Sequence, residues 1–317
     1  MGVIMKYKHL FGPVASRRLG ISLGIDLIPH KTCNFNCIYC ECGEAPPLAI
    51  ERKEYVKVDE VLEELKLYLA ENPKPEYITF SGSGEPTLNS GIGRLIDEIK
   101  NLTNIKVCVI TNSTNLIKDD LRKEIGKADL IMPSLNAVFE SSFLKIDRPN
   151  VNIKLPNIIE GIKKLGDEFQ GEIYLEIFMV EDINDSQEEL EEFVKVIKGL
   201  KVTKVQLNSL DRPAPVSWVK AMSMKRLEEI KDYFRENGIN TEIIKKYKSK
   251  NEYSAYNKDY EELILNLLIV RPSTFDDLLE VTGIEREVLG NYLDILGKEG
   301  IVKAIIEERG IFYTYKK

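Results

Sequence analysis

The sequence predicts an α/β protein, in which a partial (β/α)6 barrel is followed by a small C-terminal domain. Three observations predict this fold. Short apolar runs alternate with amphipathic stretches over residues 22–207, an alternation typical of βαβ units in a parallel sheet. Polar segments follow successive runs, where the ligand sites of such sheets lie. After residue 259 the alternation gives way to three helical segments and a hairpin.

The elements of the larger domain are predicted from hydrophobic periodicity and helix end signals. In the first helix, for example, Val58, Val61, Leu62 and Leu65 recur at helical spacing. Strands are expected at residues 22–28, 77–81, 107–111, 130–134, 173–180 and 202–207. Helices are expected at residues 58–69, 91–102, 118–125, 151–165 and 186–199.

The C-terminal residues 259–317 predict a separate domain, joined to residues 1–244 by a basic linker at 245–258. Helices are expected at 260–270, 274–282 and 286–299, and strands at 300–304 and 310–315. Three helices and a β-hairpin resemble a winged helix. Residues 258–317 carry eight basic against twelve acidic side chains. This balance disfavours DNA binding and favours docking of a protein or peptide.

Length and composition are those of an ordinary globular protein. Of 317 residues, 43% are hydrophobic and 30% charged, which suits one large domain with a small appendage. No run approaches the roughly 18 apolar residues of a membrane span, and the N-terminal residues lack the apolar core of a secretory signal. We therefore expect a cytoplasmic protein with no membrane partner.

Two stretches are locally basic, although the net charge of −7 argues against a generic binder of polyanions. Residues 1–31 and 245–258 each carry five basic side chains against one acidic side chain. Tyr247, Tyr253 and Tyr256 interleave with the lysines of the second stretch. Basic residues mixed with aromatics suit RNA, while a solvated linker explains the same composition equally well.

The candidate metal site is a cluster of three cysteines. Cys33, Cys37 and Cys40 form a C-x3-C-x2-C motif directly after the first predicted strand. Structural zinc requires four ligands, and five cysteines in 317 residues are too sparse for a disulfide framework. A four-iron cluster held by three thiolates keeps one iron open for another ligand. The motif therefore predicts a [4Fe-4S] cluster with one open position.

The other cysteines and His30 are expected to be secondary. For Cys42, two residues after the motif, we favour no ligand role, and a substrate-side thiol or part of an auxiliary site are the alternatives. Cys108 lies in an apolar run and is expected to be a buried small hydrophobe. His30 is expected to be structural or to orient a metal ligand without binding the metal itself.

Polar residues at the ends of the other predicted strands are expected to meet at one rim of the sheet. The glycine-rich segment at 81–87 is neither a P-loop nor a dinucleotide-binding fingerprint. Residues of this kind also cap the element that follows, which is the alternative for the later ones. The rim candidates are Ser83, Gly84, Glu85, Asn112, Ser134, Asn136, Glu176, Asn208, Asp211 and Arg212.

With these motifs the chain resembles the radical S-adenosylmethionine (radical SAM) enzymes. Tyr39 precedes the last cysteine of the motif, and Ser83-Gly84-Glu85 stands where the superfamily has Gly-Gly-Glu. More narrowly, segments 12–20 and 79–87 are similar to uncharacterised iron–sulfur oxidoreductases related to the tRNA wyosine-base synthases. The resemblance covers about residues 7–215. The wyosine synthases carry further cysteines upstream, and this chain has none before Cys33.

The resemblance implies a chemistry and a set of contacts. The three cysteines would hold the cluster, and SAM would bind its open iron. An electron from an external donor would cleave SAM to methionine and a 5′-deoxyadenosyl radical, which takes a hydrogen atom from the substrate. The residues implied as SAM contacts are Tyr39, Ser83, Gly84, Glu85, Asn112, Ser134, Asn136 and Glu176.

The sequence leaves three functions open. The first is a radical SAM enzyme acting on RNA, for instance in tRNA base modification, with the two basic stretches as the approach. The second is such an enzyme acting on a protein or peptide docked by the winged helix. The third is a redox-sensing regulator whose cluster controls DNA binding, and it is the least favoured because it gives Ser83-Gly84-Glu85 no role.

Overall fold

The computed structural model describes most of the chain in two folded units. The described residues are 7–16, 18–43, 48–72, 74–210, 216, 218–244, 260–284, 286–307 and 310–316. Several sequence-based predictions fall on residues outside these ranges, namely Lys6, Arg17, Asp211, Arg212 and the basic linker at 245–258.

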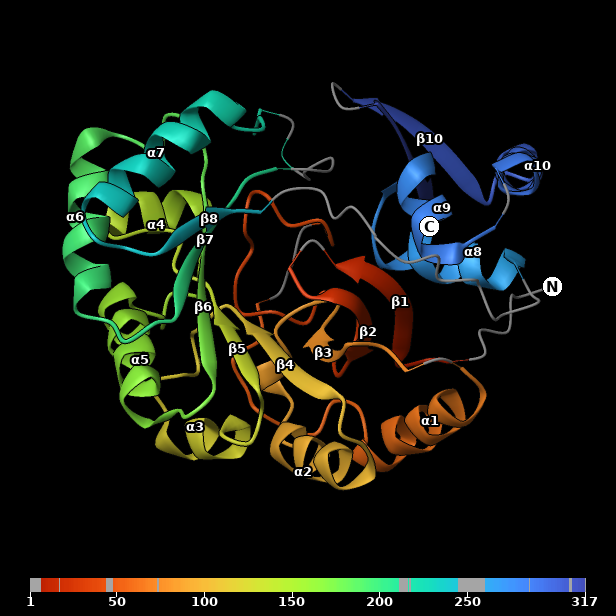
Figure 1. The fold of residues 1–317 in the computed structure, drawn as a ribbon, viewed down its shortest axis with the longest axis horizontal. Coiled ribbons are helices and arrows are strands. Elements are labelled where there is room, and N and C mark those ends of the chain that lie inside the picture. The colour runs from red at the N-terminus through yellow and green to blue at the C-terminus, as the bar shows by residue number, and fades with distance from the viewer. Residues whose placement is uncertain are drawn as a thin grey trace.

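An eight-stranded sheet forms the larger unit, with strands in the order β1 to β8. β1 pairs antiparallel with β2, and every later neighbour pairs parallel. The strands follow an arc with helices along its outer side (Figure 1). The predicted α/β fold with a mostly parallel sheet is confirmed. The strands are β1 (Leu10–Ser16), β2 (Gly20–Asp26), β3 (Tyr77–Ser81), β4 (Lys106–Thr111), β5 (Leu130–Pro133), β6 (Glu172–Phe178), β7 (Lys204–Asn208) and β8 (Thr241–Ile243).

The helices of this unit bury one apolar side against the sheet. In α2, for example, Leu95, Ile96 and Ile99 are fully buried. Ser186 and Ser223 start α6 and α7 by accepting hydrogen bonds from backbone N–H groups of the first turn. The helices are α1 (Val58–Glu71), the 3-10 turn η1 (Pro86–Leu88), α2 (Ile92–Leu102), α3 (Asp119–Ile125), α4 (Glu140–Ile146), α5 (Leu155–Glu168), α6 (Gln187–Lys198) and α7 (Met224–Glu236). Among the described helices, none is long and apolar enough to span a bilayer.

All six predicted strands and five predicted helices of this unit are present, with ends shifted by a few residues. The sequence analysis missed β1, α4, α7 and β8. Gly12 and Pro13 lie in the middle of β1, and proline is disfavoured within strands. The pairing accommodates them because the register with β2 shifts between Phe11 and Val14. β8 has only three residues, too few to show a period.

The C-terminal unit contains, within its described residues, three helices and a three-stranded antiparallel sheet in the order β10–β11–β9. Thr274 and Asp277 form a capping box at the start of α9. The two-residue strand β9 was not predicted. The elements are α8 (Tyr260–Val270), β9 (Ser273–Thr274), α9 (Phe275–Thr282), α10 (Arg286–Lys298), β10 (Val302–Glu307) and β11 (Gly310–Tyr315).

The β1–β2 hairpin connects the two units. Val14 of β1 is buried in the apolar core of the C-terminal unit, next to Leu268 and Leu278, and α8 and α9 contact β1. On the large sheet, the ring of Phe11 covers Gly24, where an added Cβ would lie 2.1 Å from a ring carbon. The hairpin therefore contacts the C-terminal unit through β1, and Gly24 is required for the packing of Phe11 across the hairpin.

The substitution Gly24→Val is expected to lower the free energy of unfolding by about 1–3 kcal/mol, because the new side chain overlaps the Phe11 ring. Chemical denaturation followed by circular dichroism measures the change. Adding Phe11→Ala should recover part of the loss. Gly297→Ala is the control, since its Cβ meets nothing within 4 Å. Parent-like stability of Gly24→Val would contradict the packing described.

Candidate functional site

The cysteine loop follows β2 and is anchored to the C-terminal half of α4. The N–H of Ile38 donates to the carbonyl of Ile146 at 2.9 Å. The ring of Phe35 packs edge-on against Phe143, with centroids 5.6 Å apart. Cys33, Cys37 and Cys40 are all half-buried. A loop without regular structure is thus held by α4, with its three cysteines only partly exposed.

The Ser83-Gly84-Glu85 segment after β3 pairs directly with the cysteine loop. The N–H of Lys31 donates to the carbonyl of Ser83 at 2.7 Å, and the N–H of Glu85 donates to the carbonyl of Thr32 at 3.1 Å. A Cβ at Gly84 would lie 2.1 Å from the Thr32 carbonyl oxygen. Only glycine permits this approach, so the two motifs that carry the resemblance are in contact.

Asp26, the last residue of β2, orients Ser83. Its Oδ2 accepts hydrogen bonds from the Ser83 N–H at 3.0 Å and from the Ser83 hydroxyl at 2.5 Å. Burial raises the pKa of Asp26. The serine that replaces the first glycine of the superfamily pattern therefore ties its loop to β2. The sequence analysis did not single out Asp26, which belongs to a predicted strand.

The carboxylate of Glu85 joins the ends of β3 and β4. The side chain is buried and accepts from the N–H and hydroxyl of Thr87, at 3.0 and 2.5 Å, and from the hydroxyl of Thr111 and the N–H of Asn112, both at 2.7 Å. Burial raises its pKa. The Nδ2 of Asn112 then lies 3.7 Å from the sulfur of Cys33. Glu85 therefore acts on the cysteine loop through Asn112.

Asn136 links the cysteine loop to β6. Its Nδ2 donates to the hydroxyl of Tyr39 at 2.7 Å and to Asp147 at 2.8 Å, and its Oδ1 accepts from the N–H of Phe178 at 2.9 Å. The rings of Tyr39 and Phe178 stack with centroids 3.8 Å apart. Burial raises the pKa of Asp147 to about 7. The amide of Asn136 is engaged by protein partners on both sides, which positions the Tyr39 ring.

Ser134, directly after β5, and Glu176 of β6 are joined by an isolated parallel bridge. The guanidinium of Arg18, from the β1–β2 turn, forms an ion pair with Glu176. The Nε of Arg18 is buried without a hydrogen-bond partner in the described part of the chain. Next to it, Leu19 packs with Cys108 on the side of the sheet away from the helices. The segment 12–20 therefore delivers a cation to the inner side of the arc.

The three motif thiols differ in their surroundings. Burial raises the pKa of Cys33 to about 12, and burial also raises that of Cys37. The pKa of Cys40 is lowered to about 6, because the Cys42 thiol donates a hydrogen bond to it and the ammonium of Lys31 lies 2.7 Å from its sulfur. Metal binding removes the proton from each thiol. Lys31 therefore supplies compensating charge at one corner of the site.

The donor set suits an iron–sulfur cluster. Within the described ranges, no three His, Cys, Asp or Glu side chains converge closely enough to hold one metal ion. A single zinc ion would bring its sulfur ligands to within about 4 Å of one another, whereas a four-iron cluster binds each thiolate at a different iron. The N–H of Phe35 lies 3.5 Å from the sulfur of Cys33. Such hydrogen bonds to sulfur adjust the reduction potential of clusters.

The structure gathers the eight implied SAM contacts around the cysteine loop, and their roles toward SAM stay predictions. Among the other residues named from the sequence, Cys108 is fully buried in an apolar cluster, as expected. The Cys42 thiol lies 3.5 Å from the carbonyl of Gly82. Asn208 ends β7 in a buried position. Lys31 and Asp147, which contact motif sulfurs, were missed because nothing in their local sequence marks them.

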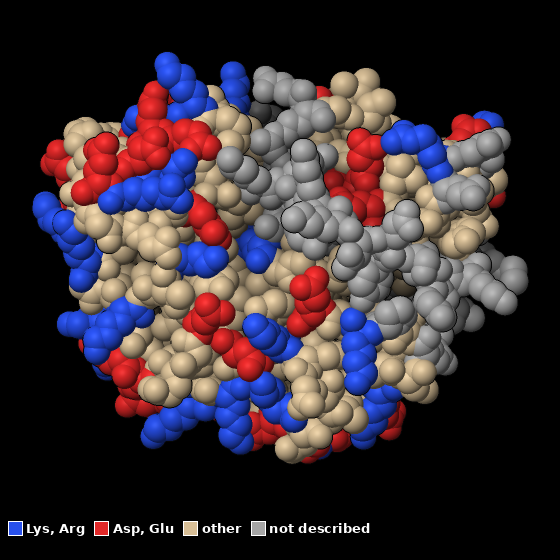
Figure 2. Space-filling model, viewed as in Figure 1, with Lys and Arg blue, Asp and Glu red and all other residues tan. Residues whose placement is uncertain are grey.

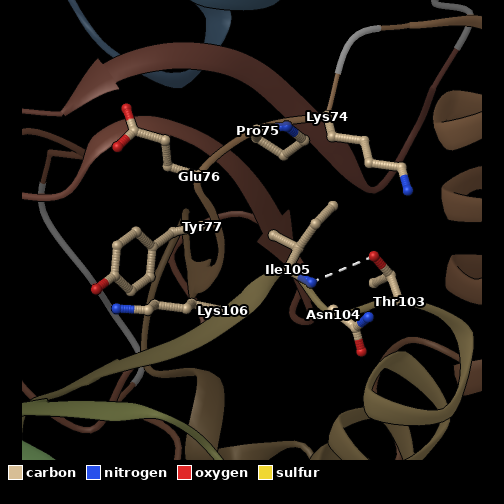
Figure 3. Close-up of a pocket in the computed structure, with 8 residues that line it drawn as sticks. All are labelled: Lys74, Pro75, Glu76, Tyr77, Thr103, Asn104, Ile105 and Lys106. Atoms are coloured by element: carbon tan, nitrogen blue, oxygen red, sulfur yellow. Dashed lines mark hydrogen bonds between the residues drawn. The ribbon is translucent and has the colours of Figure 1, made fainter.

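A separate cavity of about 450 Å³ lies at the amino ends of β3 and β4 (Figure 3). The ammonium of Lys106 lies 5.7 Å from the centre of the Tyr77 ring, and the N–H of Ile105 donates to the Thr103 hydroxyl at 3.3 Å. Parallel α/β sheets bind reactants at the carboxyl ends of their strands. This cavity is at the opposite end from the cysteine loop and does not belong to the candidate site.

The substitution Gly84→Ala is expected to weaken cluster binding by roughly 10–100-fold, the effect typical of residues that orient metal ligands. The added Cβ overlaps the Thr32 carbonyl and separates the two loops. The iron and sulfide content after anaerobic reconstitution measures how much cluster the variant binds. Gly297→Ala is again the control. Parent-like iron content in Gly84→Ala would show that the contact does not support the cluster.

Comparison with solved structures shows the fold. A radical SAM methyltransferase from Sphaerobacter thermophilus superimposes with a TM-score of 0.56 at 19% identity, over 70% of this chain and 66% of that one. The structure of TYW1 with a lysine-pyruvate adduct bound superimposes with a TM-score of 0.53 at 17% identity, over 72% of this chain and 76% of that one. Both likenesses concern the α/β domain type.

Comparison of sequences shows the family. A protein named GTPase Obg from Brachyspira hyodysenteriae is 43% identical over 270 residues, which are 85% of this chain and 40% of that protein, so the chain spans less than half of this relative. The UPF0026 protein slr1464 of Synechocystis is 36% identical over 66% of this chain and 78% of its own length. The model of the radical SAM superfamily matches residues 27–196, from the end of β2 through the cysteine loop and into α6. Chemistry, contacts and sequence thus agree that the chain belongs to the radical SAM superfamily, as a UPF0026 protein.

Proposed function

We propose that this protein is a radical SAM enzyme that reductively cleaves SAM and takes a hydrogen atom from a large substrate, an RNA, as in the modification of a tRNA base. The observation that carries the proposal is the pairing of Ser83-Gly84-Glu85 with Lys31 and Thr32. This pairing puts the loop that resembles the SAM-binding motif against the loop that carries the three thiols. An external one-electron donor completes the reaction.

Different residues bind the cluster, orient the loops beside it and donate toward its sulfur ligands. When bound, the cluster and SAM together supply the 5′-deoxyadenosyl radical. Cys33, Cys37 and Cys40 hold the cluster. Asp26 and Glu85 orient the two loops that flank it, while Lys31 and Asn112 donate toward the sulfurs.

An apolar cluster shields one side of the site. The Tyr39 ring packs on a group of buried residues that includes Ile38, Phe178 and Val180. Radical chemistry requires that water and other hydrogen donors be kept away from the reacting atoms, which is a task of the protein in cofactor enzymes. We infer that this cluster excludes water beside the SAM site.

We also infer the finer architecture of both units. Strands β2 to β7 with their helices correspond to a partial (β/α)6 barrel of radical SAM type, with β1 and β8 as additions at the edges. The C-terminal unit has the element order helix, strand, helix, helix and two-stranded hairpin, which supports a winged helix.

The second candidate is a radical SAM enzyme acting on a protein or peptide docked by the C-terminal unit. The net acidity of residues 258–317, eight basic against twelve acidic side chains, favours it over DNA binding. A cluster-controlled DNA-binding regulator has the least support, since it leaves the contact at Gly84 without a purpose.

The proposal is tested by anaerobic reconstitution with iron and sulfide, chemical reduction, and assay of 5′-deoxyadenosine with and without bulk tRNA. We expect 5′-deoxyadenosine to form and its yield to rise with tRNA, because a bound substrate consumes the radical. No 5′-deoxyadenosine from fully reconstituted, reduced protein would refute SAM cleavage. A rise with a peptide mixture and none with tRNA would replace the RNA substrate by the second candidate.

The ligand count is tested by single alanine substitutions at the cysteines. Cys33→Ala, Cys37→Ala and Cys40→Ala are each expected to abolish 5′-deoxyadenosine formation and to lower iron content, because each removes one of three thiolates. Cys42→Ala is the matched control and should keep both, since it removes a neighbouring thiol and leaves all three motif thiolates in place. Loss of iron in Cys42→Ala would make it a fourth ligand.

A further inference from the structure

A cavity of about 370 Å³ lies between the cysteine loop and the C-terminal unit. One wall consists of His30 and residues 40–43, which include the last motif cysteine and Cys42. The other wall comes from the end of α8 with residues 271–272, and from β10 and β11 with Lys316. The C-terminal unit therefore borders the candidate active site instead of forming a detached domain.

The wall from the C-terminal unit is cationic, although the unit as a whole is acidic. Residues 259–317 carry seven basic and twelve acidic side chains. Arg271, Lys303 and Lys316 line the cavity, and within the described residues no acidic side chain of this unit does. Only Glu41, from the cysteine loop, opposes them. Charges of one sign gathered along a cavity raise the local concentration of the opposite charge, so the expected ligand is an anion.

The uncharged residues that line the cavity indicate which class of anion it suits. Tyr315 lines the cavity while its ring also packs against the core of the C-terminal unit, and Ile269, Val270 and Ile305 add apolar lining. Aromatic and apolar contacts do not stabilise a bound inorganic anion, whereas a nucleotide combines a phosphate with a planar base that packs on such groups. The volume is at the lower end of the range for cavities that hold small organic groups, about 300–1,000 Å³. The volume of one nucleotide is of that order.

Two cations of the N-terminal basic stretch already have protein partners. Of the basic stretch at residues 1–31, Arg18 pairs with Glu176 and Lys31 contacts Cys40. Over the α/β domain, acidic and basic side chains are interspersed on the face shown in Figure 2. Arg18 and Lys31 are thus committed to other side chains, whereas Lys303 and Lys316 line the cavity.

We propose that this cavity binds one phosphate and the adjoining base of a single-stranded RNA, and so holds the neighbouring target nucleotide at the open side of the cysteine loop. The choice of RNA over an acidic peptide rests on the proposed function. The cavity makes the C-terminal unit a part of substrate recognition, with Lys303 and Lys316 as phosphate contacts and Tyr315 as a base contact.

The test measures binding of a fluorescein-labelled single-stranded oligoribonucleotide to the reconstituted protein by fluorescence anisotropy at several salt concentrations. The double variant Lys303→Glu with Lys316→Glu is expected to bind at least tenfold more weakly. Its salt dependence should fall by about 0.7 in the slope of log K against log salt, the amount for one neutralised phosphate on a single strand. Thermal unfolding of each variant shows that it is folded.

The matched control is Lys195→Glu with Lys225→Glu, the same change of charge at exposed lysines of α6 and α7. It should bind RNA like the parent. Parent-like binding by the cavity variant, or equal weakening in the control, would overturn the proposal. A labelled hexaglutamate peptide is the rival probe. If only its binding depends on Lys303 and Lys316, the site belongs to a peptide and the RNA assignment is wrong.

A further variant separates base contact from charge. Tyr315→Leu keeps an apolar side chain and every cation, so it should weaken RNA binding by roughly 5–100-fold, equivalent to about 1–3 kcal/mol for a stacked base, without changing the salt slope. Unchanged affinity would remove the base from the proposal. SAM cleavage by the parent without RNA tests the proposed function by itself: its absence would refute that function, while the binding comparison would still decide the cavity.

Discussion

The contact between Gly84 and the carbonyl of Thr32 is the constraint on which the site depends. The cysteine loop has little regular structure of its own, and its position is fixed by backbone bonds to the segment after α4 and to Ser83-Gly84-Glu85. The buried carboxylates of Asp26 and Glu85 hold the second of these partners. Removing a buried hydrogen-bond partner costs about 1–3 kcal/mol for the group left unpaired. Several such bonds converge on this contact, so a displacement of the cysteine loop would also break hydrogen bonds of the Ser83-Gly84-Glu85 segment.

The β1–β2 hairpin extends this constraint to the rest of the molecule. Its turn sends Arg18 to Glu176 on the inner side of the sheet, while Val14 enters the core of the C-terminal unit. The sequence analysis identified segment 12–20 only by its similarity to other proteins. The structure gives it a structural role. It fixes a charge inside the arc and sets the position of the C-terminal unit. That position creates the cavity beside Cys42.

The sequence could predict what is encoded locally. Periodicity predicted the parallel strands, which the structure contains, and the spacing of the cysteines predicts a ligand set, because both patterns lie within short windows. The contacts that shape the site are not local. Asp147 lies 3.6 Å from the sulfur of Cys37 across 110 positions of sequence, and Arg18 meets Glu176 across 158. Such partners depend on strand register and loop paths, which no short window contains. The edge strand β1 was missed because Pro13 opposes its assignment locally while tertiary packing stabilises it.

The net charge of the C-terminal unit does not describe its cavity, for a related reason. Counting residues 258–317 gives an acidic domain, and the sequence analysis disfavoured DNA binding on that ground. At 0.1 M salt, however, the Debye length is only about 10 Å, so a ligand responds to the side chains nearest to it. Arg271, Lys303 and Lys316 line the cavity, and the acids of this unit's described residues do not. The fold therefore gathers cations along the cavity that the sequence intersperses with acids, and the proposed recognition depends on this arrangement.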